Sequence, residues 1–102
     1  MKIDVYIKVR FKTSEEGGRK TSLKRKIPFG VDFYACPMII DDCFYDCRLL
    51  IGDMEIELGR YYELSVVFLD RESALQNLVA GKNISLWEGT EVATGQIVKI
   101  CG

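Results

Sequence analysis

The sequence contains one dense group of basic side chains that could contact phosphate groups. It lies between residues 19 and 26 and consists of Arg19, Lys20, Thr21, Lys24, Arg25 and Lys26. Ammonium and guanidinium groups displace the counterions of a nucleic acid and hold its backbone without reading the base sequence. The group is therefore a candidate site for RNA or another partner. Charge runs more often form a solvated face that keeps a small domain soluble, and this alternative stays open.

The residue types that common hydrolytic chemistry needs are missing. The 102 residues include no histidine, which is the commonest general base and the commonest metal ligand. The segment 16–21 has adjacent glycines, whereas a phosphate-cradling loop needs spaced glycines before Gly-Lys-Ser or Gly-Lys-Thr. We therefore expect a protein that is not an enzyme and that uses no catalytic residues and no cofactor.

Four cysteines raise the question of a metal site or disulfides. They are Cys36, Cys43, Cys47 and Cys101. A structural zinc site needs two pairs of closely spaced ligands, and only Cys43 and Cys47 approach that spacing. We expect no metal site, and we expect the cysteines to be reduced and mostly buried, as in a cytosolic protein.

Two further features are candidates for a protein interface. Trp87 precedes an expected hairpin turn, and tryptophan is enriched at the energetic centres of interfaces, although it could equally plug the end of a barrel. Glu55 and Glu57 form an acidic face that would suit a basic partner. Half-exposed strands usually turn such a face to solvent, so both interpretations stay open here too.

The charge is unevenly distributed along the chain. Residues 1–30 have nine basic and three acidic side chains, a net charge of +6. Residues 31–102 have five basic and twelve acidic side chains, a net charge of −7. The protein can therefore present a cationic patch although its total charge is −1.

An all-β domain is expected to position these side chains. A chain of 102 residues with 48% hydrophobic side chains has the length of one domain, which we assign to residues 1–102. Asp70 is the expected N-cap of a short helical segment over 71–80 that stops at Gly81. Alternating apolar residues predict strands over 3–11, 31–36, 44–51, 54–58, 61–69, 84–87 and 92–100.

Short strands separated by turns are typical of a sandwich or a closed barrel. A barrel is preferred for so small a sheet, because closure removes strand edges that would otherwise promote aggregation. No apolar run approaches the roughly 20 residues of a membrane-spanning helix, and no secretory signal is seen. We therefore expect a cytoplasmic protein with no membrane partner.

Several stretches resemble one known family. They are Val5-Tyr6-Ile7, the Glu-Gly-Gly-Arg-Lys-Thr loop at 16–21, the aromatic pair Phe33-Tyr34, and the closing hairpin over 86–100. In order and spacing they are similar to the C-terminal barrel of elongation factor Tu, the tRNA-delivering translational GTPase. Lys20 stands where that family has histidine. The family's arginine before the aromatic strand is missing from 28–31, and the segment between Leu69 and Glu88 is longer and more helical.

The resemblance implies a six-stranded, antiparallel, closed, Greek-key-like barrel. In the family this barrel touches the T-arm of aminoacyl-tRNA and packs against a nucleotide domain, for which 102 residues leave no room. We therefore expect a stand-alone, non-catalytic module that binds tRNA or a protein of the translation apparatus. The alternative is a small cytosolic immunity or inhibitor protein that sequesters a toxin through its acidic surface at 41–63.

Overall fold

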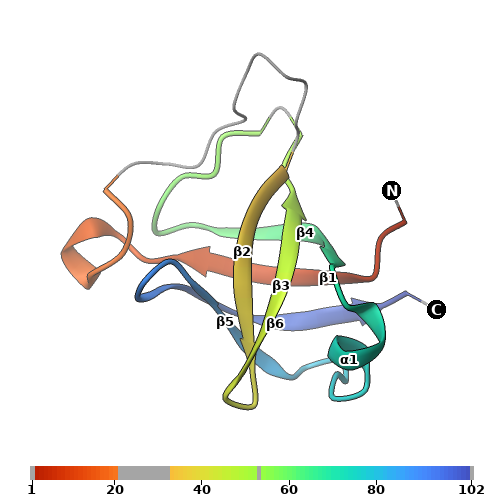
Figure 1. Cartoon of the computed structure of the whole chain (residues 1–102). Coiled ribbons are helices and arrows are strands. Elements are labelled where there is room, and N and C mark those ends of the chain that lie inside the picture. The colour runs from red at the N-terminus through yellow and green to blue at the C-terminus, as the bar shows by residue number, and fades with distance from the viewer. Residues whose placement is uncertain (1, 21–32, 53, 102) are drawn as a thin grey trace.

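The computed structural model of the protein describes residues 2–20, 33–52 and 54–101. Six strands, one 3-10 turn and one short α-helix follow each other along the chain (Figure 1). They are β1 (Val5–Phe11), η1 (Ser14–Glu16), β2 (Phe33–Ile40), β3 (Cys43–Leu50), β4 (Tyr61–Phe68), α1 (Arg71–Leu75), β5 (Asn83–Trp87) and β6 (Glu91–Ile100).

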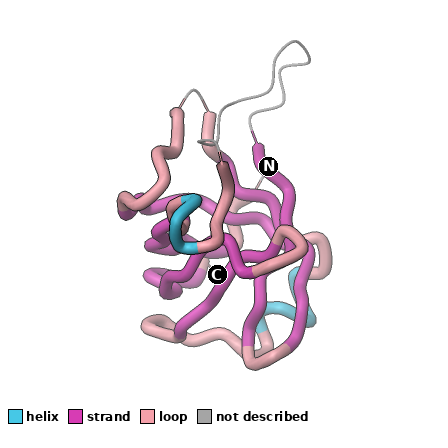
Figure 2. The backbone as a smooth tube through the Cα atoms, turned by 90° about the vertical axis from the view of Figure 1, so that its left-hand side faces the viewer, coloured by secondary structure: helices cyan, strands magenta, loops and turns pink. Residues whose placement is uncertain are grey.

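The strands form a closed antiparallel barrel. Their order is β1-β4-β3-β2-β5-β6, and β6 closes the wall by pairing with β1. Three strands that are consecutive in the sequence lie side by side, and β1 is placed next to β4, which is a Greek-key arrangement. Figure 2 shows the strands forming the body of the molecule. The predicted fold, a six-stranded closed barrel with one short helix, is confirmed.

The alternation of side chains explains how the strands build this wall. In β1, Val5, Ile7, Val9 and Phe11 are buried, while the residues between them are partly or fully exposed. Successive side chains of a strand point to opposite faces, so one set fills the barrel and the other covers it. The interior is completed by further fully buried side chains, among them Met38, Ile40, Leu49, Leu64, Val66, Leu86 and Ile97.

The two mouths of the barrel differ in what covers them. At one mouth β1, β3 and β5 end, and η1 follows β1; we call it the η1 end. At the other mouth β2, β4 and β6 end, and both α1 and the termini lie there (Figure 1); we call it the α1 end.

A buried carboxylate ties the α1 end together. Asp4 is only 3% exposed, and its side chain accepts hydrogen bonds from Arg71 Nε and from the Phe68 backbone N–H, both at 2.8 Å. Arg71 also donates to the Cys101 carbonyl at 3.1 Å. Asp4 and Arg71 therefore join the start of β1, the end of β4, α1 and the C-terminal residues.

The helix begins where the sequence predicts and is shorter than expected. The Asp70 carboxylate accepts hydrogen bonds from the Ser73 backbone N–H and hydroxyl, which lowers the pKa of Asp70. α1 spans Arg71–Leu75, and the chain continues in turns over part of the expected 71–80 segment. Ala74 and Leu78 are buried, so one helical turn is enough to cover this part of the core.

The expected strand over 54–58 is wrong. Within this segment only Ile56 makes an isolated β-bridge. Ile56 is fully buried, but Met54 is exposed and Leu58 is only partly buried. One inward-pointing side chain anchors the segment to the core, so the alternation of apolar and acidic residues here does not reflect strand pairing.

Candidate functional site

Three segments that are far apart in the sequence meet at Arg19. The Arg19 guanidinium lies 5.4 Å from the ring centroid of Tyr34 and 2.6 Å from a carboxylate oxygen of Glu88. Tyr34 in turn packs edge-on against Phe11, with ring centroids 6.3 Å apart. Arg19 is therefore held at the η1 end, between the start of β2 and the turn that joins β5 to β6.

The loop that carries Arg19 is shaped by the residues before it. Thr13 and Glu16 form a reciprocal capping box on η1, and Arg10 makes an ion pair with Glu16 at 3.0 Å. The hydrogen bond from Arg10, together with bonds from Thr13, lowers the pKa of Glu16 from 4.5 to about 2. Gly18 lies so close to the Lys12 backbone that any side chain would collide with it. The Glu-Gly-Gly-Arg sequence thus has a local structural explanation.

The structure places only part of the predicted basic group. Arg19 is half-buried in its ion pair with Glu88, and Lys20 is exposed beside it. Thr21, Lys24, Arg25 and Lys26 lie outside the described residues. Whether the group binds RNA therefore remains a prediction.

Trp87 lies on the outer wall of the barrel. Ile84 and Leu86 point inward from β5 and are buried, so the alternation turns Trp87 outward. Its ring meets the ring of Phe44 edge-on, with centroids 5.7 Å apart, and Phe44 is 57% exposed. The two rings form an aromatic pair that a partner can reach from solvent.

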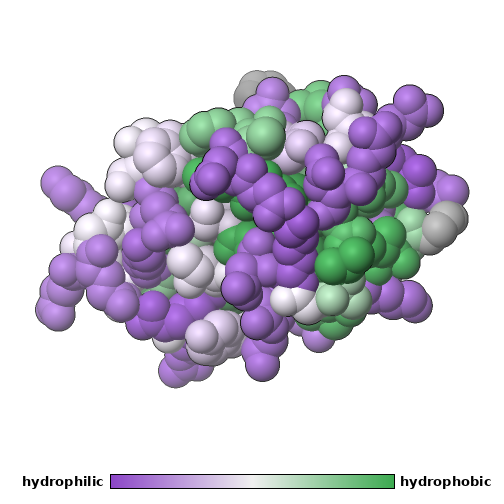
Figure 3. Space-filling model, turned by 90° about the horizontal axis from the view of Figure 1, so that it is seen from below, coloured by the Kyte–Doolittle hydropathy of each residue, from purple (hydrophilic) through white to green (hydrophobic). Residues whose placement is uncertain are grey.

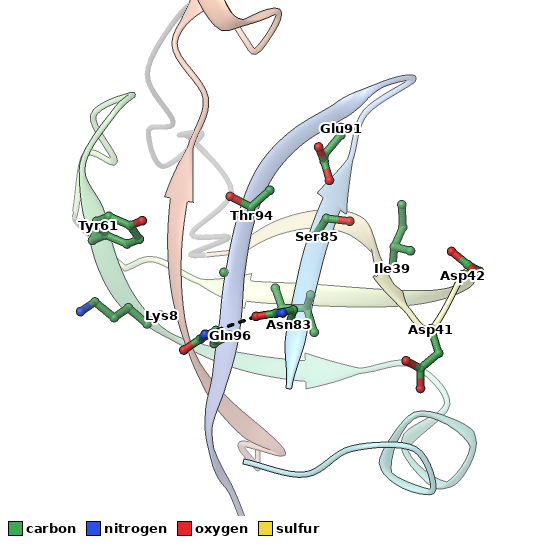
Figure 4. A pocket seen from close by; sticks show the side chains of 12 residues that line it. Lys8, Ile39, Asp41, Asp42, Tyr61, Asn83, Ser85, Glu91, Thr94 and Gln96 are labelled. Carbon is green, nitrogen blue, oxygen red and sulfur yellow. Dashed lines mark hydrogen bonds between the residues drawn. The ribbon is translucent and has the colours of Figure 1, made fainter. Parts of the chain in front are cut away.

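A shallow groove of about 660 Å³ runs along the outer wall over β1, β5 and β6 (Figure 4). Lys8 and Tyr61 stand on one side of it, and Asp41 and Asp42 stand on the opposite side. The floor carries mainly neutral polar groups, which are Asn83, Ser85, Thr94 and Gln96.

Strand register brings these polar side chains together. Ser85 on β5 is paired with Thr94 on β6, and Asn83 is paired with Gln96, whose amide donates to the Asn83 side chain at 3.2 Å. Gln96 is also the register partner of Lys8 on β1. Hydroxyl and amide groups in such rows can hydrogen-bond a polar partner.

Two of the groove's three carboxylates already have basic partners. Glu91 accepts from Lys12 Nζ at 2.7 Å, and Asp41 is paired with Lys82. The groove is therefore suited to binding a partner through hydrogen bonds to its uncharged polar side chains. The sequence analysis missed this groove, although the run of uncharged polar residues at alternate positions over 83–96 could have indicated it.

The acidic face proposed for a basic partner is placed only in part. Glu55 and Glu57 are both exposed and flank the buried Ile56. The Glu57 carboxylate is paired with Arg60 at 3.0 Å, and its backbone N–H donates to the Tyr62 hydroxyl at 3.0 Å. Both glutamates lie in the segment between β3 and β4, whereas Trp87 is the last residue of β5.

The cysteines are free thiols in different surroundings. Cys36 and Cys47 face each other across β2 and β3 and are buried, whereas Cys43 is exposed and Cys101 is half-buried. A hydrogen bond with Cys36 and burial raise the pKa of the Cys47 thiol. Among the described residues, no three cysteine or carboxylate side chains gather as a possible metal site.

No family model matches the chain, and no curated protein matches it. In the part of the chain that the structure describes, none of the helices has the length and apolar character needed to span a membrane.

Proposed function

We propose that the protein is a non-catalytic binding module that resembles the C-terminal barrel of elongation factor Tu and engages a protein of the translation apparatus. The observation that carries this proposal is the convergence at Arg19. The loop at 16–20, the aromatic Tyr34 and Glu88 of the closing hairpin come from distant parts of the sequence, and each belongs to a stretch on which the resemblance rests. The closed six-stranded barrel is also the fold that the resemblance implies.

The described residues favour a protein over tRNA as the partner. Arg19, a member of the basic group, is occupied by Glu88 and Tyr34 within the chain. Phe44 and Trp87 present an aromatic pair on the outer wall, and aromatic side chains are enriched at protein interfaces.

Fluorescence anisotropy tests this proposal with two probes, the isolated nucleotide domain of elongation factor Tu and a labelled tRNA. We expect the nucleotide domain to bind and Trp87→Ala to weaken that binding about tenfold, since central aromatic residues dominate interface energies. Lys20→Ala is the matched control and should leave the affinity within about twofold.

The tRNA probe separates the two kinds of partner. RNA binding should weaken steeply with salt and fall when Lys24, Arg25 and Lys26 are replaced by alanine. That result would identify tRNA as the partner in place of a protein. If neither probe binds, the proposed link to the translation apparatus is wrong.

The alternative, an inhibitor that sequesters a toxin through the acidic surface at 41–63, has less support. Asp41 and Glu57 are paired with Lys82 and Arg60, so part of that surface is neutralised within the chain. Charge reversal at Glu55 and Glu57 tests it, because this change should abolish binding of a basic toxin and leave the nucleotide-domain probe unaffected.

A further inference from the structure

The start of β3, residues 43–46, has no register partner in β4 among the described residues. β3 pairs with β4 only through residues 47–50 in the described chain, because β4 ends at Phe68 and the chain then turns into α1. Ile40 and Cys43 close the two-residue turn between β2 and β3, so Phe44 and Asp46 direct their backbone groups away from β2. The Leu69 N–H donating to the Asp46 carbonyl at 3.0 Å agrees with this direction.

A pocket of about 340 Å³ opens beside this edge. It is lined by Phe44, Tyr45, Asp46, Leu69, Asp70 and Ser73, which come from β3, from the end of β4 and from α1. Phe44 is 57% exposed and Leu69 is 61% exposed. Figure 3 shows the molecule from below, with apolar patches among hydrophilic side chains. Large apolar side chains lining a concave site are typical of binding surfaces.

Carboxylates surround the pocket. Asp46 and Asp70 are part of its lining, and Asp42 lies in the turn two residues before Phe44. The hydrogen bonds from Ser73 lower the pKa of Asp70. The pocket therefore combines apolar walls with a negative rim.

We propose that the free edge of β3 and the adjoining pocket bind an extended peptide segment that carries basic and apolar side chains on the same face. The segment adds to β3 as a strand, and its backbone bonds to the N–H and C=O of Phe44. Because side chains two positions apart in an extended chain point to the same face, an apolar residue enters between Phe44 and Leu69 while the basic residues two positions away lie beside Asp46 on that face. A second copy of this chain fits poorly, since two such acidic surfaces repel each other.

This inference rests on the proposed function, because a protein of the translation apparatus would carry the segment. The test itself uses a synthetic peptide and no part of the translation apparatus. The probe is a fluorescein-labelled hexapeptide, Lys-Thr-Leu-Thr-Lys-Thr, which carries its two lysines and its leucine on one face when extended; it is added to the full chain and followed by anisotropy and by backbone amide chemical shifts. We expect saturable binding with a dissociation constant on the order of 100 µM, because the contact is far smaller than a standard interface. The largest amide shifts should occur at Phe44, Asp46 and Leu69.

Matched variants identify the surface. Phe44→Ser should weaken binding about tenfold, whereas Val98→Ser, which removes an exposed apolar side chain from β6, should change it less than about twofold. Asp46→Asn should weaken binding about threefold, and Glu63→Gln on β4 should leave it unchanged within about twofold. Circular dichroism checks that each variant keeps the strand content of the parent.

The outcomes separate the possible occupants. A peptide with glutamate in place of lysine should not bind, and equal binding of that peptide would contradict the role of the acidic rim. Failure of the lysine peptide to bind, or equal binding to Phe44→Ser, would overturn the inference while leaving the nucleotide-domain result standing. A concentration-dependent dimer in sedimentation velocity that Phe44→Ser abolishes would assign the edge to a second copy.

Discussion

The two ends of the barrel are held by different kinds of interaction. At the α1 end, the buried Asp4 carboxylate joins the start of β1 to the end of β4 and to α1 through its contacts with Phe68 and Arg71. At the η1 end, Arg10 with Glu16, Lys12 with Glu91, and Arg19 with Glu88 form ion pairs in which both partners are partly exposed. A buried charge depends strongly on its partner, whereas exposed pairs contribute little each.

The two ends should therefore tolerate substitutions of their charged residues to different degrees. The α1 end is held through a buried carboxylate with a charged partner, while the η1 end is stabilised by several partly exposed ion pairs that each contribute little. Substitutions at the two ends should therefore differ in their effect on the free energy of unfolding, and the following changes test this in order of expected size.

Asp4→Asn should have the largest effect. It leaves Arg71 without its carboxylate and places an amide against the Phe68 N–H, so we expect a loss of about 3 kcal/mol in the free energy of unfolding. Urea denaturation followed by circular dichroism measures this loss. Glu72→Gln, which neutralises an exposed carboxylate in α1 next to Arg71, should change the free energy of unfolding by less than about 0.5 kcal/mol. A loss below about 1 kcal/mol for Asp4→Asn would contradict a central role for this contact.

Arg19→Ala should cost about 1 kcal/mol, because it removes both a partly buried ion pair and the stacking on Tyr34. A double-mutant cycle with Glu88→Gln isolates the ion pair, for which we expect a coupling of about 0.5 kcal/mol. Arg60→Ala is the control, since its pair with Glu57 is largely exposed and should contribute almost nothing. Equal losses of stability for Arg19→Ala and Arg60→Ala would contradict a larger contribution from the Arg19 contacts.

Asp42→Gly should stabilise the protein slightly. Asp41 and Asp42 form the turn between β2 and β3 with φ values of 49° and 66°, which favour glycine at the second position. Relief of this strain outweighs the extra freedom of glycine in the unfolded chain, so we expect a gain of about 0.5 kcal/mol. Thermal denaturation at neutral pH measures the gain. A loss of stability would show that the left-handed backbone is not strained here.

Titration of Glu16 should have the smallest effect. Its pKa of about 2 lies below the ordinary 4.5, so its contribution is present above pH 4.5 and is lost as the pH falls towards 2. Carboxyl carbon shifts in NMR spectra measure this pKa directly. Arg10→Gln removes the main cause and should raise the pKa of Glu16 towards 4.5. An unchanged pKa in that variant would assign the effect to Thr13 instead.

The sequence predicts the barrel well because local alternation determines which side chains point inward. β1 and β4 follow this rule almost residue by residue, whereas β6 departs from it where its pairings with β1 and β5 shift register. Asp70 is the N-cap that its position before the helical segment indicates. The rule fails over 54–58, since alternation cannot distinguish a paired strand from a loop anchored by Ile56 alone.

The candidate sites depend on contacts that no local pattern encodes. Glu88 is 69 residues from Arg19 in the sequence. Its carboxylate pairs with the guanidinium that the sequence analysis assigned to a possible phosphate-binding group. The outer position of Trp87 could have been deduced from the buried Ile84 and Leu86, but its contact with Phe44 required the order of the strands. The acid-rimmed pocket exists only because β4 leaves β3 early, which is a property of the register.

One joint in the wall is much shorter than the others. In the described chain, β2 and β5 are paired only through Met38 with Leu86 and Ile39 with Ser85. Pro37 stands just before this joint, and proline has no N–H with which to lengthen it. Because this pairing is the shortest among the described strands, we expect β2 and β5 to separate before any other part of the barrel unfolds. Amide protons there should exchange with solvent long before those of β1, which is flanked along its length by β4 and β6.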